Sequence, residues 1–112
     1  MSEKFGSGDY GGQIGNRLPP HNSQLKHIFR QAEGHLADTA RNRQAVLELI
    51  NDPANEVATD ARGNGWYSRL NSDGSQLWAV VRGGVLQNAG VNKPPRDWDS
   101  ITGFNRNPAK RR

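Results

Sequence analysis

Two histidines and several cationic side chains lie close together within residues 26–43 of this chain. The stretch contains His27 and His35, and its four cations are Lys26, Arg30, Arg41 and Arg43. Histidine can give and take a proton near neutral pH, and arginine presents N–H donors in a planar fork that matches a phosphate group. These are the side-chain types that cleavage of RNA without a metal ion would need.

Cleavage of RNA through attack by its own 2′-hydroxyl requires three chemical groups. A base removes the hydroxyl proton, an acid protonates the leaving 5′ oxygen, and a cation or hydrogen-bond donor stabilises the phosphate. His27 and His35 are the candidates for base and acid, in either order. Arg82, at the end of a predicted strand, is the third candidate catalytic residue, because its guanidinium can hold the phosphate.

Other side chains are candidates for binding the substrate rather than for proton transfer. A cation and a hydroxyl at the predicted start of a helix can contact a phosphate there. An exposed tyrosine can stack on a base, and a glutamine can bind a base edge. The predicted substrate-binding residues are Arg30, Thr39, Arg43, Tyr67 and Gln76.

Each candidate also has an ordinary structural explanation, and the sequence leaves both open. His27 can be a half-buried ring bonded to a backbone carbonyl, and His35 can be a helix-end residue favoured by the helix dipole. Thr39 can be a helix cap. Arg43 can pair with Glu48 or a nearby aspartate. Tyr67 is exposed only if its neighbour Trp66 packs inward, and Gln76 can simply satisfy a strand end.

Several other kinds of site are excluded by the spacing of the residues. His27 and His35 are eight positions apart, there is no H-E-x-x-H motif and there is no cysteine, so we predict no metal site. Neither a phosphate-binding loop of the form G-x-x-x-x-G-K-[ST] nor a G-x-S-x-G motif occurs. We therefore expect neither a metal nor any other cofactor.

The composition indicates one small basic domain. The chain has 112 residues, a net charge of +4, 33% hydrophobic residues and no cysteine. Eleven of its fifteen cations are arginines, a bias that favours phosphate or carboxylate partners over an ordinary basic surface. No apolar run is long enough to span a membrane, and the glycine-rich first fifteen residues lack the hydrophobic segment of a signal peptide.

The same composition divides the chain into three parts. Residues 1–22 are rich in glycine, end near Pro19-Pro20 and contain few apolar side chains, so we predict a flexible polar linker there. Residues 105–112 are predicted to be a basic tail. The folded domain is then expected at residues 23–104.

The apolar periodicity predicts two helices followed by an antiparallel sheet. A first helix is expected from Ser23 to Gly34, and a second, capped by Asp38 or Thr39, as far as Ile50. From Val57 the period becomes two, with turns at Asp73-Gly74 and Gly83-Gly84. The expected strands are 57–60, 66–71, 75–82 and 85–91. We predict an α+β fold, in which two N-terminal helices pack on a three- to four-stranded antiparallel sheet.

The chain from His27 to Gly103 resembles a family of C-terminal toxin domains of bacterial polymorphic toxins, among them contact-dependent inhibition proteins and LXG-type toxins. Short segments carry the resemblance: His27-Ile28-Phe29-Arg30, Glu33-Gly34-His35-Leu36, Asp38-Thr39, Asn42-Arg43, Gly65-Trp66-Tyr67, Asp73-Gly74-Ser75-Gln76-Leu77-Trp78, Val81-Arg82 and Gly90-Val91-Asn92. The resemblance implies a ribonuclease of the barnase–EndoU–colicin–RelE type, with His27, His35 and Arg82 as functional residues.

The resemblance also implies a biological role, which the residues alone do not indicate. Such domains are delivered or secreted as toxins, act in the cytoplasm of target bacteria, commonly cut tRNA or rRNA, and are neutralised by a cognate immunity protein. The basic charge of this chain suits an acidic partner of that kind. Two alternatives stay open: a non-catalytic nucleic-acid-binding module that uses the same basic surface, and a structural domain that binds a protein partner.

Overall fold

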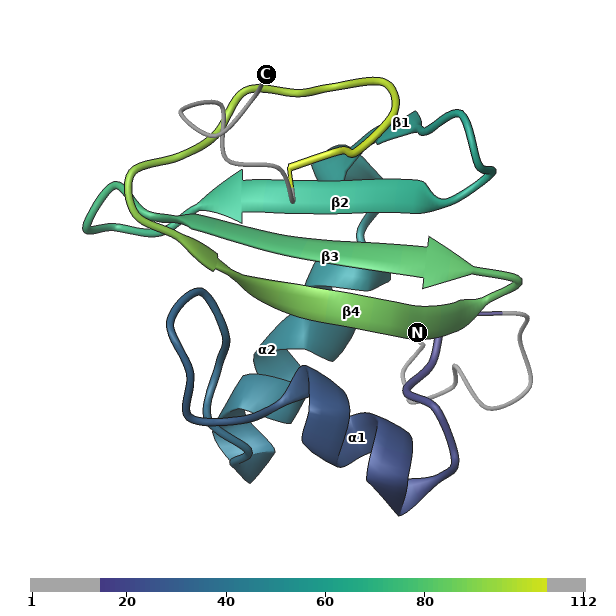
Figure 1. Ribbon diagram of the computed structural model, residues 1–112, viewed down its shortest axis with the longest axis vertical. Helices are drawn as coiled ribbons and strands as arrows, with labels where there is room; N and C mark the ends of the chain where they lie inside the picture. The colour runs from purple at the N-terminus through teal and green to yellow at the C-terminus, as the bar shows by residue number, and fades with distance from the viewer. Residues whose placement is uncertain (1–14, 105–112) are drawn as a thin grey trace, which may run out of the picture.

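The computed structural model describes residues 15–104, which form two helices and one four-stranded sheet (Figure 1). Helix α1 spans Asn22–Ile28 and helix α2 spans Ala40–Ile50; a short 3-10 turn, η3, follows at Pro53–Asn55. The strands are β1 (Glu56–Thr59), β2 (Gly65–Leu70), β3 (Gln76–Arg82) and β4 (Val85–Asn92). The α+β class and the antiparallel sheet are as predicted.

The sheet is a simple meander in which each strand pairs with the next along the chain. Its order is β1-β2-β3-β4, and all three pairs are antiparallel. The Asp73-Gly74 and Gly83-Gly84 turns join the last three strands, as their sequences predicted. Strand β4 therefore lies at one edge of the sheet, and Figure 1 shows α1 next to that edge, with α2 crossing behind the sheet.

The main hydrophobic core lies between the helices and one face of the sheet. Alternate residues of β3 point toward the helices, and with the apolar stripe of α2 they are almost fully buried. The most buried members are Phe29, Val46, Leu49, Ile50, Ala79, Leu86 and Ala89. Burial of one such side chain contributes roughly 1.5–3 kcal/mol to stability, so this layer sets the positions of both helices.

The second face of the sheet carries a smaller aromatic core. Trp66 and Trp78 lie with their ring centroids 5.6 Å apart, and Phe104 packs edge-on against Trp66 at 6.0 Å. The segment after β4, residues 93–104, returns over this face (Figure 1) and supplies Trp98 and Phe104. Strand β3 is therefore buried on both sides, and all its residues except Arg82 are buried.

The predicted boundaries need two corrections at the N-terminal end. Helix α1 ends at Ile28 rather than near Gly34, because Phe29 adopts an extended backbone and pairs with Leu36. Residues 15–22, which composition assigned to the linker, belong to the fold: Asn16 donates to the Ile50 carbonyl at 2.6 Å, and Arg17 pairs with Val85. Residues 1–14 and the predicted tail at 105–112 lie outside the described residues.

Asp60 is a buried carboxylate that organises the turn between β1 and β2. It accepts hydrogen bonds from the Trp66 indole at 2.8 Å, from the backbone N–H groups of Arg62 and Asn64, and from the Asn64 side chain. Burial raises the pKa of Asp60, but these four hydrogen bonds outweigh it and lower the pKa from 3.8 to about 2. The charged form therefore stabilises the fold.

Replacing Asp60 by its neutral isostere should lower stability in a pH-dependent way. Because the folded pKa lies below the unfolded value, the contribution is complete above about pH 4 and is lost as pH falls toward 2. We expect Asp60→Asn to lower the free energy of unfolding by roughly 1–2 kcal/mol at pH 7, with the difference shrinking below pH 4. Urea denaturation at several pH values measures this, with the exposed cap variant Asp52→Asn as control. An equal loss at pH 7 and pH 2 would contradict the assignment.

Candidate functional site

His27, Arg30 and His35 come together at the end of α1. One guanidinium nitrogen of Arg30 lies 3.2 Å from Nδ1 of His27, and the other lies 3.2 Å from Nε2 of His35. His27 and Arg30 are exposed, and His35 is half-buried. The two histidines predicted as base and acid therefore share one arginine, and that arginine is Arg30 rather than Arg82.

The hydrogen bonds of this cluster determine where each imidazole carries its proton. An arginine can only donate hydrogen bonds, so the ring nitrogens that face Arg30 must be unprotonated acceptors. His27 then carries its proton on Nε2. His35 carries its proton on Nδ1, which donates to the carbonyl of Ile28 at 3.3 Å. In this arrangement each ring directs one nitrogen at the guanidinium.

The loop that carries His35 is fixed against the edge strand β4 by backbone contacts. Gly34 has a positive φ of +81°, a conformation that favours glycine, and its carbonyl accepts a hydrogen bond from Val91 N–H at 3.1 Å. A Cβ on Gly90 would collide with that carbonyl and would lie 2.8 Å from the Trp78 ring. Two glycines thus allow the loop backbone to lie directly on the sheet edge.

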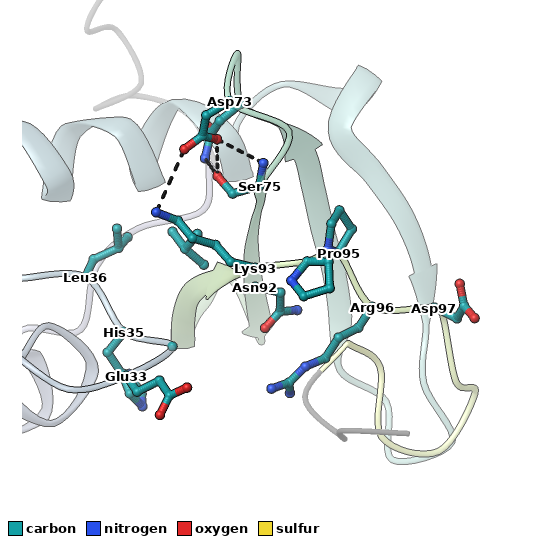
Figure 2. Close-up of a pocket in the computed structure, with 14 residues that line it drawn as sticks. Glu33, His35, Leu36, Asp73, Ser75, Asn92, Lys93, Pro95, Arg96 and Asp97 are labelled. Atoms are coloured by element: carbon teal, nitrogen blue, oxygen red, sulfur yellow. Dashed lines mark hydrogen bonds and ion pairs between the residues drawn. The ribbon is translucent and has the colours of Figure 1, made fainter. Parts of the chain in front are cut away.

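A polar groove of about 840 Å³ opens beside His35 (Figure 2). One wall is the 33–36 loop, and the opposite wall is the segment 93–97, which contributes Lys93 and Arg96. Lys93 reaches Asp73 at 3.8 Å, a long and exposed ion pair. A hydrogen bond from the Ser75 hydroxyl lowers the pKa of Asp73, so its carboxylate is charged beside the groove. His27 lies outside this groove, in a shallower depression lined in part by Gln24 and Gln87.

Two of the predicted substrate-binding residues instead maintain the start of α2. The Thr39 hydroxyl accepts a hydrogen bond from Asn42 N–H at 3.0 Å, so Thr39 is the helix cap. Arg43 donates two hydrogen bonds to Asp38, at 2.7 and 2.9 Å. This hydrogen bonding lowers the pKa of Asp38 and raises that of Arg43. Arg43 pairs with a nearby aspartate, Asp38, which is one of the two structural alternatives that the sequence left open for it.

Tyr67 and Gln76 are also structural, because both faces of the sheet are covered. Tyr67 is half-buried against the helix-side core, and its hydroxyl accepts a hydrogen bond from Asn16 at 3.2 Å, so it has a structural role. Gln76 is 6% exposed. Its side chain binds the backbone of Arg96 twice: Oε1 accepts from Arg96 N–H at 3.2 Å, and Nε2 donates to the Arg96 carbonyl at 3.1 Å.

Arg82 is not brought together with either histidine. It lies at the end of β3 on the aromatic side of the sheet, where it donates to the Arg62 carbonyl at 2.7 Å. It lines a separate depression next to Asp60, Asn64 and Thr102. The assignment of Arg82 as the third catalytic residue is therefore not supported by its position, and Arg30 takes its place in the cluster.

The sequence analysis missed Lys93 and Arg96 as members of the site. They flank the pair Pro94-Pro95 just after the last strand, in a segment without helical or strand periodicity. The available signal was the placement of two cations beside two prolines, which restrict the backbone locally. Their proximity to His35 depends on the path of the chain over the sheet, which local patterns do not specify.

No family model, curated protein or solved structure matches this chain. Within residues 15–104, no group of three or more His, Asp or Glu side chains is arranged as a metal ion would require. In that part of the chain no helix combines the length and apolar character needed to cross a membrane. The functional argument therefore depends on the geometry of the His27, Arg30 and His35 cluster itself.

A methyl group at Gly90 should displace the loop that holds His35. Because the added Cβ would overlap the carbonyl of Gly34, the backbone must move, and we expect Gly90→Ala to lower the free energy of unfolding by about 1–3 kcal/mol. The matched control is Gly65→Ala in β2, where the nearest atom outside the adjacent residues would lie at an ordinary 3.8 Å. Chemical denaturation and the NMR signals of the His35 ring report both effects; similar behaviour of the two variants would refute the close packing.

Proposed function

We propose that this protein is a metal-independent endoribonuclease in which His27, Arg30 and His35 form the active site. The observation that carries the proposal is the guanidinium of Arg30 between two imidazoles, each at 3.2 Å. Two proton-transfer groups on either side of a phosphate-binding cation are what attack by the 2′-hydroxyl requires. The three side chains are exposed or half-buried, so a substrate can reach them.

His35 is the better placed of the two histidines to act as the base. Its Nδ1 proton is directed at the Ile28 carbonyl, so Nε2, which faces Arg30, is the nitrogen that can accept a proton. When a phosphate binds Arg30, it competes with both imidazoles for the guanidinium N–H groups and releases Nε2. His35 then accepts the proton of the 2′-hydroxyl as that oxygen attacks phosphorus.

His27 then supplies the proton that the leaving 5′ oxygen needs. Once the phosphate has displaced His27 from Arg30, His27 takes up a proton from solvent. As the 2′-oxygen bonds to phosphorus, the bond from phosphorus to the 5′ oxygen breaks, and His27 donates its proton to that oxygen. The products are a 2′,3′-cyclic phosphate and a free 5′-hydroxyl, and the proton balance is closed by one histidine gaining and the other losing a proton. Arg30 stabilises the charge on the phosphate throughout.

The resemblance to polymorphic toxin domains supports a biological setting for this activity. We propose a toxin that cuts RNA, such as tRNA or rRNA, in the cytoplasm of target bacteria. An acidic immunity protein would neutralise it by covering the cluster and the groove beside it. The net charge of +4, carried mainly by arginine, favours both an RNA substrate and an acidic inhibitor.

Cleavage in the presence of EDTA tests the proposed activity. Purified protein is incubated with total cellular RNA in EDTA, beside His27→Ala, His35→Ala and Arg30→Ala. We expect the wild type to yield fragments with 2′,3′-cyclic phosphate ends, and each substitution to slow cleavage by about 100-fold or more. DNA of the same sequence should stay intact, because it lacks the attacking 2′-hydroxyl.

Arg82→Ala serves as the matched control, since it removes an exposed arginine of β3 outside the cluster. Its cleavage rate should stay within about threefold of the wild type. If RNA stays intact in EDTA and also in magnesium while binding persists, the protein is a nucleic-acid-binding module instead. If Arg82→Ala abolishes cleavage and Arg30→Ala does not, the site is wrongly assigned.

A further inference from the structure

We infer that the groove beside His35 binds the RNA strand next to the cleaved bond, with Arg96 holding the phosphate adjacent to the scissile one. The inference rests on the proposed function, and it specifies the substrate: a single-stranded segment with at least two successive phosphates. His35 links the two places, because it contacts Arg30 at 3.2 Å and also lines the groove.

The backbone of Arg96 is held by buried groups. Gln76, 6% exposed, binds both the N–H and the carbonyl of Arg96, at 3.2 and 3.1 Å. The Asn92 side chain holds Gln76 in turn, donating to its Oε1 at 2.8 Å. In Figure 2 the Arg96 side chain extends from the 93–97 wall into the groove, toward the wall that carries Glu33 and His35. The fold thus fixes the point on the wall from which this side chain enters the groove.

The chemistry of the two walls fits a nucleotide. Lys93 and Arg96 on one wall suit phosphate oxygens. Glu33 on the other wall suits the amino group of a base, since a carboxylate accepts hydrogen bonds from such groups in base recognition.

The dimensions of the groove favour a single strand. Its volume of about 840 Å³ lies within the range of about 300–1,000 Å³ that is usual for small-ligand sites, which suits a few linked groups of one strand. Sequence-selective proteins read RNA mainly where bases are unpaired and splayed out. The substrate class is therefore RNA in loops, ends or other unpaired segments.

The kinetic test compares a dinucleotide, which has only the scissile phosphate, with two trinucleotides. One trinucleotide carries an extra phosphate on the 5′ side of the scissile phosphate, and the other carries it on the 3′ side. The wild type should cleave one trinucleotide at least about tenfold faster than the dinucleotide, measured as kcat/KM, since a hydrogen bond to a charged group is worth that much. Arg96→Ala should remove this advantage, so that the variant cleaves all three substrates at a similar kcat/KM, whereas Arg96→Lys should retain part of it. Equal loss on all three substrates, or no trinucleotide advantage in the wild type, would overturn the inference.

A binding measurement keeps the inference testable if the protein proves not to cleave RNA. The affinity for a 2′-O-methyl RNA oligonucleotide, which lacks the free 2′-hydroxyl, is measured at several salt concentrations. Arg96→Ala should lower the slope of log affinity against log salt by about one, as the loss of one phosphate contact does. The matched control is Arg62→Ala at the β1–β2 turn, which should lower this slope less than Arg96→Ala does. An unchanged slope in Arg96→Ala would exclude the groove as a phosphate site, whatever the outcome for cleavage.

Discussion

The contact between the loop after α1 and the edge strand β4 determines the geometry of the proposed site. Gly90 has no Cβ to collide with the Gly34 carbonyl, so this carbonyl can accept a hydrogen bond from Val91 N–H. The loop is thereby held beside the end of α1, and its next residue, His35, comes within 3.2 Å of Arg30. This approach of two backbones therefore helps to fix the position of His35 relative to Arg30.

The sheet is covered on both faces, and each cover positions a different part of the proposed site. The helix side forms the larger core and fixes α1, which carries His27 near its end and is followed closely by Arg30. The other side is closed by the segment 93–104, whose aromatic residues pack on Trp66 and Trp78. That segment also forms one wall of the groove beside His35. The segment 93–104 therefore both completes the smaller core and positions Arg96 beside the groove.

The sequence predicted those elements whose signals are local. The Thr39 cap, the end of α2 at Ile50 and the turn at Asp73-Gly74 follow from short-range hydrogen bonding and backbone preferences, and all three are present. The nearness of His27 and His35 was also within reach, since only a helix end and a short loop separate them. Composition failed at residues 15–22, where a few specific bonds from Asn16 and Arg17 hold a polar segment in place.

The remaining site assignments depended on which surfaces are covered, and local patterns do not contain that information. Gln76 was expected either to bind a base edge or to satisfy a strand end, and the sequence did not reveal that a segment without regular structure would bury it. Tyr67 was expected to be exposed only if Trp66 packed inward, but the two rings pack in different clusters.

Binding of a non-cleavable phosphodiester, followed by NMR, tests the central claim that Arg30 holds a phosphate between His27 and His35. Before ligand is added, the two rings should carry their protons on different nitrogens, Nε2 in His27 and Nδ1 in His35. Addition of a 2′-deoxy dinucleotide should shift the Arg30 guanidinium and both imidazoles together, and leave Arg82 unchanged. Shifts centred on Arg82, or an unperturbed cluster at saturating ligand, would contradict the account.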